Sequence, residues 1–245
     1  LLPSIREHRL QNRWANAEAE LNQMESRVLS IPRDSRTIQV ERILADVYFE
    51  WAELAIAQGE LDNAVSRYDR SIETLNELLI RIPDDAESLA TLSGRHRLKA
   101  WHLSRAGRTD MAFAAWDLAI HYAAGDLRNF TQAERALERA LLGDHAGASQ
   151  EAHKVAEQPE LKVDTAVHLA RVYCRCIEAL EQDVQLTSAD RDRLTTSYAA
   201  AAIRCLGRAG SLNFEESAER AELASDAQLA ALRTTHEFQQ WFQRR

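Results

Sequence analysis

Apolar residues along most of the chain recur at intervals of three and four, the spacing of one face of an α-helix. The periodic stretches are separated by prolines and glycines, which commonly end helices. These residues are Pro32, Gly59, Pro83, Gly107, Gly143 and Pro159. The pattern predicts helices at 4–30, 34–57, 61–81, 85–106, 110–124, 127–142, 146–157, 161–182, 188–208, 215–223 and 226–243. No strand is predicted, and the short links predict antiparallel neighbours.

The first predicted helix carries a heptad pattern, in which apolar residues alternate steps of four and three. The seam consists of Leu10, Trp14, Ala17, Leu21, Met24, Val28 and Ile31. About three heptads are short for an independent coiled coil. We therefore favour packing of this helix across the following ones. Dimerisation with a second copy and continuation of an upstream helix are the alternatives.

Three predicted helix pairs share one pattern around the glycine of their turn. The residues in register are Ala52, Gly59, Ala64, Tyr68 and Ile72 in the first pair, Ala100, Gly107, Ala112, Trp116 and Ile120 in the second, and Ala136, Gly143, Ala148 and Ala152 in the third. Small residues let two helices approach closely, and glycine at the turn adopts a left-handed cap. The aromatic residue would fill the groove against the next pair, so each pair needs a neighbour.

This pattern resembles the tetratricopeptide repeat, most closely over 48–72 with AQGELDNAVSRYDRSI at its centre. The second unit departs from it at Lys99, a position usually apolar, and the third has Ala152 in place of the aromatic. The units are also longer than the usual 34 residues, so we expect the second helix of the first pair to extend to Arg81. The resemblance implies an all-α solenoid of about four irregular helix pairs.

Longer segments extend the likeness over about 170 residues. In chain order they are SIETLNELLIRIPDDAESLATL, AGRTDMAFAAWDLAI, LLGDHAGASQEA, YAAAAIRCL and LAALRTTHEFQQWF. Together they resemble the C-terminal repeat region of planctomycete-type bacterial serine/threonine protein kinases, with Leu232, Arg233 and Phe238 in matching places near the end. In that family the array follows a kinase domain, sometimes across a membrane segment. The resemblance implies an accessory region of a kinase and does not indicate what the region binds.

Composition narrows the classes of partner. The formal net charge is −8 and the sequence pI is about 5.5, so the chain repels phosphates and nucleic-acid binding is not expected. No apolar run approaches the roughly 18 residues that span a bilayer, so we expect no membrane insertion by this chain. It begins with Leu1 instead of Met, from which we expect a part of a longer protein. A cytoplasmic location is the expectation, with an upstream anchor left open.

No set of residues indicates catalysis or a bound cofactor. Kinase signatures and the nucleotide-binding P-loop are absent, so we expect this chain not to be an enzyme. Cys174, Cys176 and Cys205 are odd in number and lack a second CxC pair, which favours core or half-buried thiols. The eight histidines lack metal-ligand spacing and are predicted to lie on or near the surface, without metal. The acidic pair Asp84-Asp85 is predicted to cap a helix after Pro83.

The candidate binding surface is the inner face, which the first helix of each pair lines in tetratricopeptide arrays. Alignment to the three glycines places there Asp46, Phe49, Glu53 and Ile56, then Arg97, Trp101, Ser104 and Arg105, then Phe130, Glu134, Leu137 and Leu141. Arg97, Trp101 and Arg105 share one helix face, and an exposed aromatic between arginines is typical of a binding hot spot. A peptide with acidic and apolar residues would suit them. The alternative is that Trp101 is buried under the N-terminal helix.

The sequence therefore predicts three parts: an amphipathic helix at 1–33, tetratricopeptide-like repeats at 34–210 and short packing helices at 211–245. The predicted function is protein–protein interaction, with recruitment of a protein or peptide to an attached kinase. The residues predicted to bind it are Phe49, Glu53, Arg97, Trp101, Arg105, Phe130 and Glu134. The alternatives are an oligomerisation module forming a homodimer and a sensor domain that binds a small ligand.

Overall fold

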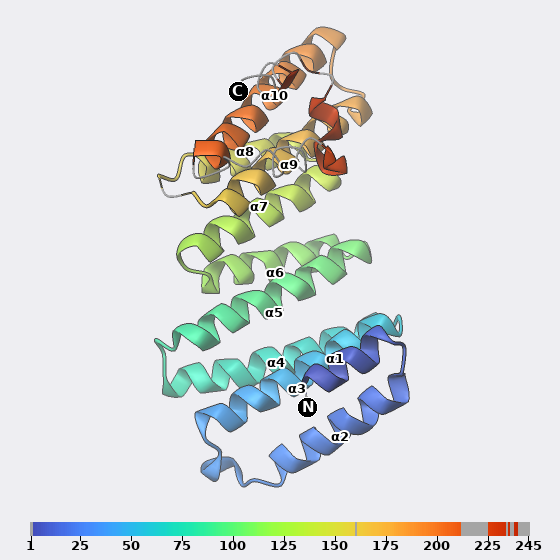
Figure 1. The fold of residues 1–245 in the computed structure, drawn as a ribbon, viewed down its shortest axis with the longest axis vertical. Coiled ribbons are helices and arrows are strands. Elements are labelled where there is room, and N and C mark those ends of the chain that lie inside the picture. The colour runs from blue at the N-terminus through green and yellow to red at the C-terminus, as the bar shows by residue number, and fades with distance from the viewer. Residues whose placement is uncertain (1, 160, 212–224, 234, 236–237, 240–245) are drawn as a thin grey trace. The chain divides into compact units, whose positions relative to one another are not determined.

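The computed structural model describes residues 2–159, 161–211, 225–233, 235 and 238–239. All regular structure in these residues is helical, and neighbouring helices pack in pairs (Figure 1). The predicted all-α class is thereby confirmed. The chain separates into two compact units, Leu1–Ala123 and Ala124–Arg245, each with its own buried core. The boundary between the units falls inside the predicted repeat region 34–210.

In the first unit, α3 packs antiparallel to α4 and α5 packs antiparallel to α6, while α1 and α2 lie against α3 (Figure 1). Its elements are α1 (Leu2–Leu10), α2 (Trp14–Leu29), the 3-10 helix η1 (Arg33–Ser35), α3 (Ile38–Ala57), α4 (Leu61–Arg81), α5 (Ala86–Arg105) and α6 (Thr109–Tyr122). The extension of α4 to Arg81 is as predicted. Helix α3 begins later than predicted, because the Thr37 hydroxyl caps it by accepting from the Val40 amide at 3.3 Å.

The predicted single helix at 4–30 is wrong, because the chain turns between α1 and α2. Asn12 has a φ of 56°, a left-handed conformation that asparagine tolerates better than most residues. Leu10 is 81% exposed as a result and does not belong to the seam. The seam residues Ala17, Leu21 and Val28 are buried within the unit, in clusters with residues of α3. This agrees with the favoured interpretation that the seam packs across the following helices.

The three aligned glycines form the same turn. Their φ angles are 80° at Gly59, 73° at Gly107 and 87° at Gly143. In each turn the amide after the glycine donates to the carbonyl five residues earlier, at 2.8, 2.9 and 3.0 Å respectively, which is the Schellman cap. All six aligned alanines, at the positions seven before and five after each glycine, have no exposed surface. The predicted register between the three helix pairs is confirmed.

Two glycines of α5 and its cap allow a matched test of backbone conformation. Gly107→Ala should lower the free energy of unfolding by about 1–2 kcal/mol, because alanine is strained at positive φ. Gly94→Ala should raise it by about 0.5–1 kcal/mol, because Gly94 is inside a helix and alanine restricts the unfolded chain. A β-carbon meets no atom within 4 Å at either position, so packing does not obscure the comparison. The free energy of unfolding is measured by urea denaturation. A change in the same direction for both variants would contradict the left-handed conformation of Gly107.

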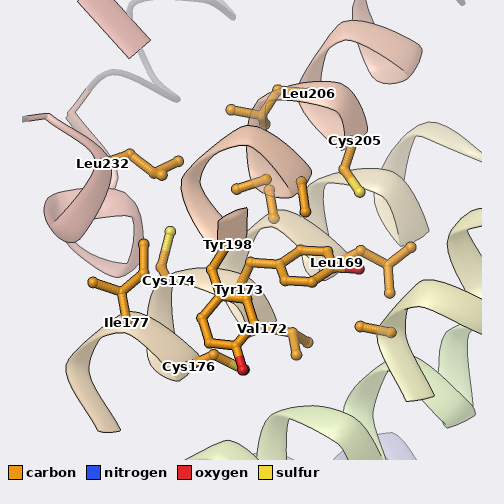
Figure 2. Close-up of a cluster of buried hydrophobic side chains, with 14 of the residues drawn as sticks. Leu169, Val172, Tyr173, Cys174, Cys176, Ile177, Tyr198, Cys205, Leu206 and Leu232 are labelled. Atoms are coloured by element: carbon orange, nitrogen blue, oxygen red, sulfur yellow. The ribbon is translucent and has the colours of Figure 1, made fainter. Parts of the chain in front are cut away.

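The second unit contains α7 (Gly125–Leu141), α8 (His145–Ala156), α9 (Val163–Gln182), α10 (Ser188–Ser211) and the 3-10 helix η2 (Ala227–Leu232). Helix α9 contacts α7, α8, α10 and η2, so it forms the centre of the unit. Figure 2 shows its side chains Leu169, Val172 and Tyr173 in the buried cluster, with Leu232 of η2.

The three cysteines lie in this cluster (Figure 2). Cys174, Cys176 and Cys205 are free thiols with at most 3% exposure, as predicted. Burial raises the pKa to about 12 for Cys174 and Cys176 and to about 11 for Cys205. They therefore remain protonated thiols at neutral pH and serve as small apolar side chains.

The C-terminal prediction is partly wrong. The predicted helix at 215–223 lies outside the described residues. The predicted helix at 226–243 is not continuous, because η2 ends at Leu232 and a turn follows at Arg233. The Thr235 hydroxyl accepts from the Phe238 amide at 3.4 Å, and residues 238–239 are helical. Leu232 and Phe238 are both buried on the cluster of the second unit.

Candidate functional site

Residues of the predicted row on α3 contact α5 in the first unit. Asp46 of α3 forms an ion pair with Arg95 of α5. Glu53 of α3 lies 3.6 Å from Nε2 of His102 on α5. The predicted α3 row therefore faces α5, but it meets Arg95 and His102. These two residues lie on a different side of α5 from the predicted row, which is centred on Trp101.

The prediction that Phe49 is exposed is wrong. Its side chain lies under the guanidinium group of Arg95, whose Cζ is 3.5 Å from the ring centroid. The Tyr68 ring lies on another side, with centroids 5.9 Å apart. Only 8% of Phe49 remains exposed. A cation over an aromatic face is attractive, so Phe49 holds α3, α4 and α5 together and offers little surface to a partner.

Glu53 is likewise occupied by other side chains of the unit. Arg9 of α1 donates to its carboxylate at 2.8 Å, and the Tyr68 hydroxyl donates to its other oxygen. Burial acts to raise the pKa of Glu53, but hydrogen bonds from His102 and Tyr68 and the Arg9 guanidinium outweigh it, so the pKa falls to about 2. Burial and the Glu53 charge raise the pKa of Tyr68. The carboxylate is therefore ionised and hydrogen-bonded within the unit at neutral pH.

Trp101 lies on the surface and is 38% exposed, so the alternative that it is a core residue is wrong. The Cζ atom of Arg105 lies 4.1 Å from the centroid of its rings. The His102 ring contacts Trp101 edge-on, with centroids 4.8 Å apart. Arg97 is half-buried on the same helix. This surface therefore offers an apolar ring with a stacked cation to solvent.

Four residues of the site were not predicted from the sequence. Arg9, Tyr68, Arg95 and His102 contact the predicted residues directly. Arg95 and His102 are seven positions apart on α5 and share a face, a signal that the sequence does contain. Arg9 gives no such signal, because its contact with Glu53 depends on where α1 folds back.

The third predicted row lies on α7, in the second unit. Phe130 is half-buried, and its ring centroid lies 5.3 Å from that of His168 on α9. Glu134 and Leu137 are half-buried, whereas Leu141 is 55% exposed. Helix α7 belongs to the second unit, whereas α3 and α5 belong to the first.

The second unit also has an open polar cavity of about 330 Å³ between α7 and α8. Arg135 and Arg139 of α7 line it, and both donate to Glu151 of α8, at 2.7 and 3.2 Å. One carboxylate thus ties the two arginines to the wall of the cavity. In the described part of the chain, no group of three histidine, cysteine or acidic residues is placed to hold a metal ion, and no helix is long and apolar enough to cross a membrane.

Among the described residues, His96 and His145 are buried, which corrects the expectation of surface or half-buried positions. His96 is 5% exposed and stacks on Tyr122 with ring centroids 5.6 Å apart. Burial and the nearby Lys99 lower its pKa to about 4. His145 is 8% exposed, with Nδ1 3.0 Å from the Tyr198 hydroxyl and Nε2 3.2 Å from Asp183. Both residues therefore contribute to packing within their units.

Asp85 has the predicted capping role at the start of α5. Its carboxylate accepts from the Ser88 amide at 3.0 Å and also binds Arg42 of α3 at 2.7 Å. Lys99, the departure from the repeat pattern, pairs with Asp69 of α4 at 2.5 Å. A charged pair therefore occupies the place where an apolar contact was expected.

No family model matches the chain, and no match was found among curated proteins or solved structures.

Proposed function

We propose that this chain is a tetratricopeptide-like module for protein–protein interaction. The repeated helix pair supports the proposal, because three pairs share the glycine cap and the alanines that set the spacing of their helices. Such pairs present side chains of their first helix on one surface. The proposed role needs no catalytic group, and the polar side chains described above are used in pairs within the units.

The observation that carries the proposal is the exposed Trp101 with Arg105 stacked on it. Tryptophan and arginine are the residues most enriched in binding hot spots. The carboxylates of the neighbouring helix face, Asp46 and Glu53, are already paired with Arg95 and Arg9. A peptide that places an apolar side chain on Trp101 and a carboxylate beside Arg105 would meet matching chemistry.

We further propose that the module recruits substrates or partners to an attached bacterial serine/threonine kinase. Support for this step comes from the sequence segments that resemble the C-terminal repeat region of such kinases. The kinase domain itself would have to lie elsewhere in the full-length protein, since this chain lacks its signatures.

The test is selection of peptides from a random display library on the immobilised chain. We expect the wild-type protein to enrich peptides that combine acidic and apolar residues. The double variant Trp101→Ala, Arg105→Ala should bind the selected peptides about thirtyfold more weakly or worse, as expected for a hot spot of about 2 kcal/mol.

Leu118→Ala is the matched control, because Leu118 is 43% exposed on α6 and lies away from Trp101 in the sequence. Helical circular dichroism must show that all variants are folded. If the folded double variant retains the same peptides with unchanged affinity, binding lies elsewhere and the proposed surface is wrong.

A further inference from the structure

Helix α1 lies in a groove formed by α2 and α3. Its residue Ile5 has no exposed surface and packs in a cluster with Leu21 of α2 and with Val47 and Leu54 of α3. Ile5 is the one fully buried side chain that α1 contributes among its described residues. Leu2 of α1 is partly buried and packs against the same cluster. The floor of the groove is therefore apolar and receives two aliphatic side chains from α1.

Carboxylates surround this apolar floor on the α3 side. Arg6 donates from Nε to Glu50 at 2.5 Å, and Arg9 donates to Glu53 at 2.8 Å. Glu50 has no exposed surface, although carboxylates are seldom fully buried without a cation. The two arginines are three residues apart on α1, so they project from the same side of the helix.

On the α2 side of the groove, a single carboxylate, that of Glu20, contacts α1. Ser4 donates its hydroxyl to Glu20 at 2.6–2.7 Å, and Nε2 of His8 lies 3.4 Å from Glu20. The groove thus presents three carboxylates, Glu20, Glu50 and Glu53, around an apolar centre. Its complement is a short helix with aliphatic residues three positions apart, as Leu2 and Ile5 are, and basic residues on both sides.

Three features limit the attachment of α1. A nine-residue helix is marginally stable without tertiary contacts, and α1 joins α2 through a turn with Asn12 at positive φ. In addition, Oε2 of Glu50 is buried without a hydrogen bond in the described structure, since the Arg9 nitrogen lies 3.6 Å from it. A ligand that donates to this oxygen would satisfy the groove better than α1 does.

We infer that the groove between α2 and α3 is a receptor for a short basic amphipathic helix, that α1 is its resident intramolecular ligand, and that a partner helix of the same chemistry binds by displacing α1. The partner would carry an aliphatic residue followed by arginines at the next and fourth positions, as in Ile5, Arg6 and Arg9. The inference rests on the contacts of Ile5, Arg6 and Arg9 with the groove and does not depend on the peptide site proposed above.

The short linker between α1 and α2 determines how displacement of α1 by a peptide can be measured. A helix held by a short linker competes at an effective concentration in the millimolar range. A free peptide of identical sequence should therefore bind the wild-type chain weakly. Substitutions that release α1 from the groove remove this competition and should leave the groove accessible to the peptide.

The experiment uses the full chain with Arg6→Glu and Arg9→Glu and a fluorescent peptide of residues 1–12 with the natural sequence. By fluorescence anisotropy, we expect the variant to bind this peptide about tenfold or more tightly than the wild type does. The variant Arg13→Glu, Arg27→Glu makes the same charge change at exposed arginines and should behave as wild type. A peptide carrying Arg6→Glu and Arg9→Glu should not bind.

The inference is overturned if the Arg6→Glu, Arg9→Glu variant binds the peptide no better than the wild type, or binds the charge-reversed peptide equally well. Amide hydrogen exchange of the wild-type chain decides the matter if the variant does not fold. A displaceable α1 should exchange about tenfold or more faster than α3, whereas exchange of α1 and α3 at one common rate would contradict it. Adding Trp101→Ala and Arg105→Ala should leave peptide binding to the groove unchanged.

Discussion

Replacing Trp116 by alanine is expected to lower the free energy of unfolding of the first unit by about 3–5 kcal/mol. Trp116 is 1% exposed on α6 and packs against Ala100, Ala115 and Ala119. Alanines cannot extend into the space that the indole leaves, so a cavity should remain. The cost therefore includes both the lost burial of the indole and the unfilled volume.

Two further variants test whether the loss of stability in Trp116→Ala comes from the buried indole. Trp116→Phe keeps most of the apolar volume and should cost clearly less than Trp116→Ala. Leu118→Ala removes a side chain from the same helix that is 43% exposed and should change stability by less than about 1 kcal/mol. Urea denaturation followed by helical circular dichroism measures all three. Equal losses for Trp116→Ala and Leu118→Ala would show that Trp116 is not a centre of packing.

The position of Trp116 also shows what the repeat pattern could predict. Tyr68, Trp116 and Ala152 occupy the same register, and each is buried. The pattern predicted the small residues and the glycine caps correctly because these depend on contacts inside one helix pair. It could not predict how the space beside Ala152 is filled. There the central helix α9 supplies Leu169, Val172 and Tyr173 to the same cluster.

Local sequence signals also fail where a long-range contact selects between similar conformations. The helical periodicity continues through Asn12, so one helix at 4–30 was the natural prediction. A left-handed asparagine costs on the order of 1–2 kcal/mol. The contacts of Ile5, Arg6 and Arg9 with α3 outweigh such a cost, but their partners are more than 40 residues away in the chain.

The same reason explains the errors at the candidate site. The alignment identified the face of α3 that contacts α5, yet it treated Phe49 and Glu53 as exposed. It did not select the side of α5 that carries Arg95 and His102. Phe49 is covered by Arg95, which follows 46 residues later, and Glu53 is bound by Arg9, which precedes it by 44 residues. Periodicity reports the direction of a side chain from its helix, not which neighbour reaches it. The contact between Trp101 and Arg105 agrees with the sequence pattern, because the two residues are neighbours on one helix.

Glu53→Gln should make the stability of the first unit less dependent on pH in the acidic range. The pKa of Glu53 is about 2 in the folded protein, compared with an ordinary value of 4.5. The unfolded chain therefore binds the proton more tightly, and the stabilisation by ionised Glu53 is complete above about pH 4.5 and disappears as the pH falls through about 2. The difference corresponds to on the order of 3 kcal/mol at neutral pH.

Urea denaturation from pH 7 to pH 3, followed by tryptophan fluorescence, measures this effect. Four of the five tryptophans belong to the first unit, so the signal reports mainly on it. The wild type should be more stable than Glu53→Gln at pH 7, and most of that advantage should be lost by pH 3. Glu73→Gln is the matched control, because Glu73 is exposed on α4, and its curve should follow the wild type.

The outcome also separates two roles for Glu53. A carboxylate that only contacts a partner would leave the pH dependence of unfolding unchanged when it is replaced. A carboxylate that joins α1, α4 and α5 through Arg9, Tyr68 and His102 must stabilise the fold when it is ionised. If the unfolding free energies of wild type and Glu53→Gln change in parallel with pH, a role of Glu53 in partner binding is favoured. Converging curves would leave Trp101 and Arg105 as the exposed part of the site.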